Sequence, residues 1–252
     1  KLAVVKEEVA THLKEGEQVM YVVADFSNGD TEKLYKHISE KLFEVLGDVG
    51  VLVNNVGVSY PGALRFEEFC DEEFTKHAKS PEDLIHVNIM AAVKMTGLVL
   101  GGMKKNKRGS IVFMSSAHGR LPIGAPLYAA YGGSKAFIET FAKSLAYECQ
   151  GSGVNVQVQF PYFVATKMAK IRHASLHAPS PKAFAKSVIA ATGSSEAAVI
   201  PWWFHKIEDA LLLSLPVSIL ASVVMSMHVG LRKAYLKKLA GADSKTDSKK
   251  NK

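Results

Sequence analysis

Continuous apolar runs alternate with segments of helical apolar spacing along most of the chain. A strand that is apolar on both faces belongs to a parallel sheet covered by helices, so this alternation predicts a doubly wound parallel α/β sheet. The 48% of apolar residues and the lack of any repeat exclude a disordered, collagen-like or coiled-coil chain. The expected strands are Gln18–Asp25, Val49–Val53, Gly109–Ser116, Val154–Phe160 and the run into Ile200, and the expected helices include Lys1–Glu15, Leu34–Leu46, Tyr131–Cys149 and Lys182–Thr192.

Two local patterns add detail to this fold. Ser80–Asp83 combines a capping hydroxyl, a proline at the first helical position and two early carboxylates, which predicts a helix start and places Asn88 inside a helix. In the expected strand Val154–Phe160, valines alternate with polar residues that include Gln157 and Gln159. This half-polar pattern favours a position toward the edge of the sheet.

The net charge of +7 is concentrated at the C-terminus. Residues Arg232–Lys252 contain eight basic and two acidic side chains, so the rest of the chain has a net charge of only +1. We therefore expect no nucleic-acid partner. The two cysteines, Cys70 and Cys149, lie far apart, and the nine histidines include no His-Glu-x-x-His pattern, so the sequence predicts neither a disulfide framework nor a metal site.

Ala210–Leu231 is a run of 22 residues without a formally charged side chain, bounded by Asp209 and Arg232. Its length suffices to cross a bilayer, but Pro216 interrupts it and serines recur at every fourth residue. Two interpretations stay open, a membrane-associated helix and a helix packed on the core near a substrate pocket. We divide the chain accordingly into a domain at 1–209, the apolar segment at 210–231 and a basic tail at 232–252.

Tyr131 and Lys135 lie one helical turn apart, on one face of an expected helix. A lysine ammonium in that position stabilises a phenolate and so lowers the pKa of the tyrosine, which turns a weak acid into a usable one. Ser116 ends the preceding strand and would bring a hydroxyl to the same edge of the sheet, where open α/β folds bind ligands. Ser115 is the alternative for this role, because side chains at a strand end point to opposite faces. Tyr128 has no lysine four residues later.

Together, these residues resemble the short-chain dehydrogenase/reductase family, and the resemblance extends from Lys1 to about Thr192. Within that family, three segments resemble the 3-oxoacyl-CoA reductases of very-long-chain fatty-acid elongation and the related 17β-hydroxysteroid dehydrogenases, namely Pro126–Tyr131, Pro161–Met168 and Pro179–Pro181. The motifs that match in the family's order are Asp25 after a strand, Asn54-Asn55-Val56-Gly57 after the next strand, Asn88 in a helix, Ser116 at a strand end, and the Tyr131-x-x-x-Lys135 pair.

The resemblance implies a Rossmann-like fold and the NADPH-dependent reduction of 3-oxoacyl-CoA to 3-hydroxyacyl-CoA. It implies that Tyr131 protonates the carbonyl oxygen, that Ser116 hydrogen-bonds this oxygen, and that Lys135 lowers the pKa of Tyr131 and holds the nicotinamide ribose. Asn88 would hold a water that relays protons. A 17-ketosteroid is the alternative substrate. The implied cofactor-binding residues are Asp25, Asn54, Asn55, Gly57, Tyr131, Lys135, Val164 and Thr166.

The family's phosphate-binding loop, Thr-Gly-x3-Gly-x-Gly, does not occur in the sequence. Thr96–Met103 imitates it, but this segment follows Asn88 within an expected helix instead of following a strand. We therefore expect the first two strands of the fold and the glycine loop to be missing in front of Lys1, and the activity to belong to the full-length protein. A catalytically silent binding subunit of the elongation complex is the alternative function.

The last four residues resemble a sorting signal. Lys249 and Lys250 occupy the fourth and third positions from the carboxyl end, which resembles the dilysine retrieval signal of endoplasmic-reticulum membrane proteins. The resemblance thus implies residence at the endoplasmic-reticulum membrane, on its cytosolic face. The implied partners are acyl-CoA, the membrane and proteins of the elongase complex.

Overall fold

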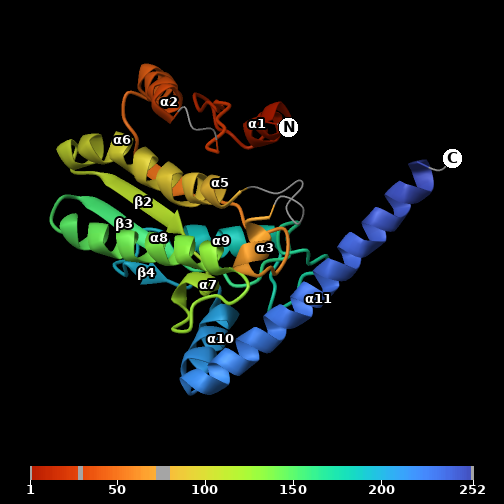
Figure 1. The fold of residues 1–252 in the computed structure, drawn as a ribbon. Coiled ribbons are helices and arrows are strands. Elements are labelled where there is room, and N and C mark those ends of the chain that lie inside the picture. Colours follow the sequence, from red (N-terminus) through yellow and green to blue (C-terminus); the bar gives the residue numbers. More distant parts are fainter. Residues whose placement is uncertain (1, 28–30, 72–79, 251–252) are drawn as a thin grey trace. The chain divides into compact units, whose positions relative to one another are not determined.

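A four-stranded parallel sheet forms the centre of residues 48–252 in the computed structural model (Figure 1). The structure describes residues 2–27, 31–71 and 80–250, and the chain divides into two units, residues 1–47 and 48–252, each of which is described by itself. The strands β1 to β4 are adjacent in chain order and every pair is parallel, which confirms the predicted fold class. They are β1 (Val51–Asn54), β2 (Gly109–Met114), β3 (Val154–Gln159) and β4 (Ala198–Val199).

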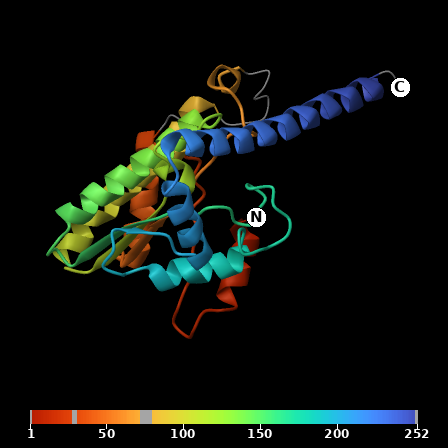
Figure 2. The same cartoon turned by 90° about the horizontal axis from the view of Figure 1, so that it is seen from below.

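Helices cover both faces of this sheet (Figures 1 and 2). The continuous helical stretch formed by α5 (Pro81–Ile85), the π-helical turn η1 (His86–Met90) and α6 (Ala91–Lys105) lies with α8 (Ala129–Glu148) on one face, and α9 (Pro181–Ala191) lies on the other. As predicted, Ser80 caps the start of α5, where its hydroxyl accepts a hydrogen bond from the Asp83 amide. The centre of the core is β2, in which Ile111, Val112 and Phe113 are fully buried.

The two glutamines of β3 correct the expected edge position. β3 pairs with β2 on one side and β4 on the other, and Gln157 and Gln159 are fully buried. Their amides donate to the carbonyl oxygens of Ala191 (3.1 Å) and Val188 (3.2 Å) in the last turn of α9. The final carbonyls of a helix lack partners within the helix, so buried amide donors are favourable at this place. The two glutamines of β3 therefore hydrogen-bond the end of α9, and they do not mark a solvent-facing strand.

In the described part of the unit formed by residues 1–47, the helices are α1 (Leu2–Ala10) and α2 (Thr31–Leu46). Tyr35 and Ile38 are buried apolar residues of α2, whereas every described side chain of α1 is exposed. The strand predicted for Gln18–Asp25 is wrong, because the structure has an irregular segment there. An apolar, β-branched composition favours a strand only when a neighbouring strand satisfies its backbone groups, and composition does not reveal that neighbour.

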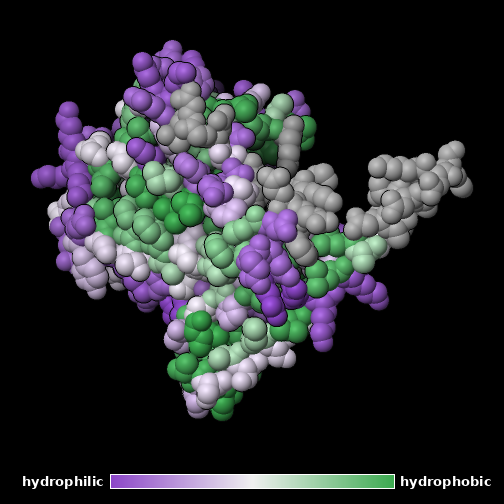
Figure 3. Space-filling model, in the orientation of Figure 1, coloured by the Kyte–Doolittle hydropathy of each residue, from purple (hydrophilic) through white to green (hydrophobic). Residues whose placement is uncertain are grey.

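The apolar run near the C-terminus forms parts of two helices, α10 (Trp203–Leu213) and α11 (Val217–Lys250), which are separated at Pro216. Asp209 anchors α10, since it accepts two hydrogen bonds from Arg120 (3.0 and 3.1 Å) and one from the Tyr162 hydroxyl (2.6 Å). Two described helical stretches, Pro81–Lys105 and Val217–Gly241, are long and apolar enough to cross a membrane. Only 17% of the apolar window in the second is buried, and Figure 3 shows apolar side chains over α10 and the beginning of α11.

Candidate functional site

The helix α8 carries Tyr131 and Lys135 at its beginning, as predicted. The side chain of Lys135 is buried, and its ammonium donates a hydrogen bond to the carbonyl oxygen of Met114 at the end of β2 (3.0 Å). Burial disfavours the charged form, so it lowers the pKa of Lys135 to about 8. The ammonium nitrogen lies 5.9 Å from the centre of the Tyr131 ring. The two side chains therefore lie near each other at the beginning of α8.

The pKa of Tyr131 shifts in the opposite direction to the prediction. Burial raises it, because the phenolate loses its hydration, and a hydrogen bond with Ser116 lowers it without reversing the shift. Lys135 is not among the groups that lower it, since its ammonium is directed to the Met114 carbonyl. In the structure as it stands, Ser116 is therefore the group that assists ionisation of Tyr131.

Ser115 and Ser116 have different surroundings, as expected for neighbouring residues at a strand end. The Ser115 hydroxyl is buried and donates to the backbone carbonyl of Lys135 (2.8 Å). Ser116 caps the short helix α7 (Ala117–Arg120), where its oxygen accepts from the His118 amide (3.3 Å) and contacts Tyr131. Ser115 thus attaches β2 to α8, while Ser116 presents its hydroxyl to the tyrosine.

Gly119 explains how α7 approaches α8 so closely. A Cβ atom at this position would lie 2.7 Å from the backbone carbonyl carbon of Lys135, which real Cβ atoms do not tolerate. Only glycine allows the two backbones to meet at this distance. The position of Ser116 and His118 relative to Tyr131 therefore depends on a residue without a side chain.

Asn88 lies in the π-helical turn η1, which interrupts an otherwise α-helical segment. Its side chain is buried and makes three hydrogen bonds: Oδ1 accepts from the Val58 amide (2.7 Å), and Nδ2 donates to the Val58 carbonyl (2.9 Å) and to the Ser134 hydroxyl (3.0 Å). The amide thereby connects the loop after β1 to α8. Single π-turns occur frequently at functional sites, where they redirect side chains.

The loop after β1 contains the predicted Asn54-Asn55-Val56-Gly57 motif. Asn54 donates to the Thr96 hydroxyl of α6 (3.2 Å), and Asn55 is exposed. A Cβ atom on Gly57 would lie 3.3 Å from the Lys135 ammonium nitrogen and 3.4 Å from Asn88 Oδ1. Glycine therefore brings this loop against both side chains. The structure unites Gly57, Asn88, Ser116, Tyr131 and Lys135 in one region.

Three further predicted site residues are Asp25, Val164 and Thr166. Asp25 belongs to the 1–47 unit, where it is exposed and accepts hydrogen bonds from the amide (3.0 Å) and hydroxyl (2.7 Å) of Ser27. Val164 and Thr166 are half-buried in the loop after β3, and the Thr166 hydroxyl accepts from the Ala169 amide (3.2 Å). The imitation of the glycine loop at Thr96–Met103 lies inside α6, which confirms that it is not a phosphate-binding loop.

The sequence prediction omitted two histidines, one of which lies beside Tyr131 and the other beside the first. His118 of α7 and His228 of α11 are stacked, with ring centres 5.2 Å apart and Nε2 atoms 3.3 Å apart, and the His118 ring lies 5.6 Å from that of Tyr131. Burial, assisted by His228, lowers the pKa of His118 to about 4. One signal was available, because His228 is the single titratable residue in the apolar run Ala210–Leu231.

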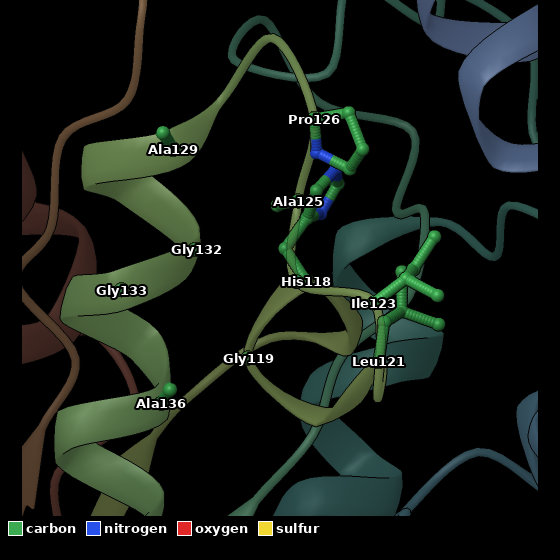
Figure 4. Close-up of a pocket in the computed structure, with 11 residues that line it drawn as sticks. His118, Gly119, Leu121, Ile123, Ala125, Pro126, Ala129, Gly132, Gly133 and Ala136 are labelled. Carbon is green, nitrogen blue, oxygen red and sulfur yellow. The ribbon is translucent and has the colours of Figure 1, made fainter. Parts of the chain in front are cut away.

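A pocket of about 410 Å³ borders His118, between the beginning of α8 and the loop at residues 121–126 (Figure 4). Apart from His118, its lining consists of apolar residues and glycines, which include Leu121, Ile123, Ala125 and Gly133. Such a surface suits an apolar ligand. The described residues contain no group of three His, Cys, Asp or Glu side chains that could hold a metal ion.

The Lys135 ammonium fits a sugar-containing cofactor. An ammonium has three N–H donors, and the described residues provide one recorded acceptor, the Met114 carbonyl. Two donors of a buried cation therefore remain for a ligand, and vicinal hydroxyls such as those of a ribose match them. Gly57 leaves the backbone beside this ammonium without a side chain that would block the approach.

Comparisons with known proteins agree with this geometry. Residues 3–176 match the family described as short chain dehydrogenase. A human very-long-chain 3-oxoacyl-CoA reductase is 36% identical over 234 residues, which cover 92% of this chain and 71% of the relative. The protein of the same name from Coprinopsis cinerea is 33% identical over 219 residues, which cover 83% of this chain and 61% of that protein.

Solved structures resemble the chain at the level of the fold. A 7β-hydroxysteroid dehydrogenase superimposes with a TM-score of 0.70 at 22% identity and covers 88% of this chain and 82% of its own. A short-chain dehydrogenase from Sphingobium yanoikuyae, solved in complex with NADPH, superimposes with a TM-score of 0.64 at 20% identity. The match covers 85% of this chain and 82% of that protein.

Proposed function

The chain belongs to the short-chain dehydrogenase family, and we propose that it reduces a 3-oxoacyl-CoA to the 3-hydroxyacyl-CoA with NADPH. The observation that carries the chemistry is the contact of Tyr131 with Ser116 beside the buried Lys135 ammonium. The substrate class rests on relatives named very-long-chain 3-oxoacyl-CoA reductase, which are 36% identical over 92% of the chain.

The protein's own groups handle the oxygen of the keto group. NADPH, when bound, supplies the hydride that is added to the carbonyl carbon. Tyr131 donates its phenolic proton to the carbonyl oxygen, which becomes the 3-hydroxyl group, and Ser116 stabilises the charge that develops on this oxygen. The hydrogen bond with Ser116, which lowers the pKa of Tyr131, stabilises the remaining phenolate. Asn88 holds the loop and α8 in place and lies where a water could return a proton toward Lys135.

Lys135 also holds the nicotinamide ribose with the two N–H donors that the Met114 carbonyl leaves unused. Asn54, Asn55 and Gly57 would form the loop beside the cofactor, and Val164 and Thr166 would line the nicotinamide. NADPH is favoured over NADH by the family resemblance and by the related structure that was solved with NADPH.

Tyr131→Phe in the purified full-length protein tests the catalytic assignment. The phenylalanine keeps the ring and removes the proton, so kcat with a long-chain 3-oxoacyl-CoA is expected to fall by about 10²- to 10⁴-fold. The affinity for NADPH, measured by calorimetry, should stay near the wild-type value. Lys135→Ala should lower both kcat and the affinity for NADPH. Turnover of the Tyr131→Phe protein at the wild-type rate would remove this residue from the mechanism.

Substrate comparison separates the alternative functions. We expect consumption of NADPH with a long-chain 3-oxoacyl-CoA and a much lower kcat/KM with a 17-ketosteroid. The reverse preference would identify a hydroxysteroid dehydrogenase. Binding of acyl-CoA without turnover of any ketone by the full-length protein would support the silent binding subunit instead.

The protein is proposed to reside at the endoplasmic-reticulum membrane, on the cytosolic face, where proteins of the elongase complex are its partners. α11 supports this location, because it buries Leu220, Val224 and His228 on one face and exposes apolar side chains on the others. A helix with this pattern can pack on the protein and face lipid at the same time. The exposed apolar residues of α11 include Val217, Ile219, Val223, Met225, Met227 and Leu231, and those of α10 include Leu211 and Leu213.

Co-sedimentation with phospholipid vesicles tests the membrane contact. Replacing the exposed Val217, Ile219 and Val223 by serine should release the protein from the vesicles, because the transfer of apolar area into lipid is lost. Serine at Lys182 and Lys186 in α9 provides a matched control outside α11. Equal sedimentation of all three proteins would argue against lipid contact through α11.

A further inference from the structure

A continuous series of side-chain contacts joins Tyr131 to the C-terminal helix α11. Tyr131 contacts the hydroxyl of Ser116, and Ser116 Oγ lies 3.5 Å from His118 Nδ1. His118 Nε2 lies 3.3 Å from His228 Nε2, and His228 Nδ1 lies 2.6 Å from the carbonyl oxygen of Pro126. The series therefore crosses from α8 through α7 to α11 and ends on the backbone of the loop that precedes α8.

The Pro126 carbonyl, which ends the series, determines the direction of the hydrogen bonds between its members. A carbonyl oxygen only accepts, so His228 must carry its proton on Nδ1 and, when neutral, has a bare Nε2. His118 must then carry its proton on Nε2 and present a bare Nδ1 to Ser116. His228 is fully buried and His118 is half-buried, and the neighbouring side chains of Tyr128 and Tyr131 are uncharged phenols, which agrees with two neutral imidazoles.

The same end point excludes a proton-transfer path through His228. A relay must end at water or at a group that gives and takes protons, and the Pro126 carbonyl does neither. His228 is fully buried, so solvent does not reach it from another side. From its His228 end, the series can therefore orient a hydroxyl but cannot deliver a proton to Tyr131.

We propose that His118 and His228 are positioning residues that hold the Ser116 hydroxyl for ketone reduction, so that α11 supports the active site as well as the fold. This inference rests on the proposed reduction. The bare Nδ1 of His118 accepts the hydroxyl hydrogen of Ser116, which keeps the serine oxygen beside Tyr131. When a carbonyl oxygen enters, Ser116 turns its hydrogen to it, and the long 3.5 Å contact makes this exchange easy.

The tautomers of the two histidines give a direct test that is independent of activity. Long-range ¹H–¹⁵N spectra of the full chain distinguish a proton on Nε2 from one on Nδ1, and spectra of His118→Phe and His228→Phe assign the signals. We expect the Nε2–H form for His118 and the Nδ1–H form for His228. In His228→Phe, the His118 signal should shift toward a mixture of both forms. A His118 that carries its proton on Nδ1 in the wild-type protein would overturn the inference.

Kinetics with a long-chain 3-oxoacyl-CoA test the consequence for Ser116. His228→Phe keeps an aromatic ring in the stack and removes both hydrogen bonds, so kcat should fall by about 5-fold, which corresponds to one neutral hydrogen bond. The KM for NADPH should not change. His118→Phe should have the same effect, and the double variant should be no slower than either single one, because the two residues act as a unit.

Val224→Ala is the matched control, since Val224 is buried one turn before His228 on the same face of α11 and makes no hydrogen bond with its side chain. It should lower the melting temperature and leave kcat unchanged. His228→Gln, whose amide can accept from His118 and donate to Pro126, should recover most of the lost rate. The proposal would be wrong if Val224→Ala and His228→Phe lost kcat equally, or if the loss in the double variant equalled the product of the two single losses. Either result would show that the two histidines act only through packing.

These experiments separate the failure of the inference from the failure of the proposed function. A wild-type protein that reduces no 3-oxoacyl-CoA and no ketosteroid would refute the reduction itself. The tautomer measurement would still decide whether the Pro126 carbonyl orders the two histidines and Ser116.

Discussion

Replacement of Asn88 by alanine is expected to destabilise the unit formed by residues 48–252 more than most single substitutions do. The Asn88 side chain makes three hydrogen bonds, two to the backbone of Val58 and one to the Ser134 hydroxyl, and its exposed fraction is 2%. Alanine removes all three and leaves buried polar groups without partners. At about 1 kcal/mol for each net hydrogen bond, the expected loss is about 3 kcal/mol.

For a unit of this size, that loss corresponds to a fall of roughly 6 to 12 °C in melting temperature, at about 2 to 4 °C per kcal/mol. The loop at Val58 should also lose its fixed distance from Lys135, so the affinity for NADPH should fall as well. Calorimetric melting and NADPH titration measure the two effects on one sample.

Ser134→Ala provides a graded control, because it removes one of the three bonds to Asn88 and the bond that the Ser134 hydroxyl donates to the Tyr131 carbonyl (2.7 Å). It should cost about two thirds as much stability as Asn88→Ala. If both variants melted at the same temperature, the two bonds to Val58 would contribute no more than the bond between Ser134 and Tyr131. If Asn88→Ala melted within ~2 °C of wild type, the account of Asn88 as the connection between loop and helix would be refuted.

Three further predictions concern stability and location. Gly119→Val should sharply reduce the soluble yield and the melting temperature, because its Cβ would meet the α8 backbone at 2.7 Å, whereas Gly133→Ala, with no atom within 4 Å, should be tolerated. His118 has its pKa lowered from 6.5 to about 4 on folding, so the unfolded chain takes up a proton in this range that the folded chain does not. Stability should therefore decrease as the pH falls from 6.5 to 4, and His118→Phe should remove this part of the slope in urea unfolding. Serine at Lys249 and Lys250 should let a tagged full-length protein leave the endoplasmic reticulum, and unchanged retention under the microscope would exclude a retrieval signal.

The sequence predicted the elements that depend on local patterns. The helix start at Ser80 and the strand β2 were predictable because capping residues and continuous apolar runs report local preferences. The strand expected at Gln18–Asp25 was wrong, and the edge position of β3 was also wrong. Both depend on which partner lies beside a strand, and a partner distant in the sequence leaves no local trace.

In the candidate site too, features set by local spacing were predictable, and features set by distant packing partners were not. The spacing of Tyr131 and Lys135 was predictable because a helix places residues four apart on one face. The direction of the Tyr131 pKa shift was not, because it depends on burial and on the Met114 carbonyl that takes the lysine's hydrogen bond. His118 and His228 are 110 positions apart, and only the packing of α11 brings them together. The retrieval signal stays a prediction, since the side chains of Lys249 and Lys250 and all of Asn251 and Lys252 lie outside the described part of the structure.

The π-helical turn at His86–Met90 has a consequence for how this segment tolerates insertions and deletions. In the turn, the Ala91 amide bonds to the His86 carbonyl five residues earlier, so the helix contains one residue more than an α-helix of equal length. Five residues of a π-turn span about the same arc as four residues of an α-helix, so removal of one residue here, other than Asn88, would restore regular α-helical bonding and leave the flanking segments on their present faces. The same removal between Asn88 and Thr96 within α6 would rotate the two parts of the helix by about 100° relative to each other. Asn88 would then no longer face Val58 while Thr96 faces Asn54. The π-turn is therefore a place where this segment can lose a residue and keep the alignment of its two faces.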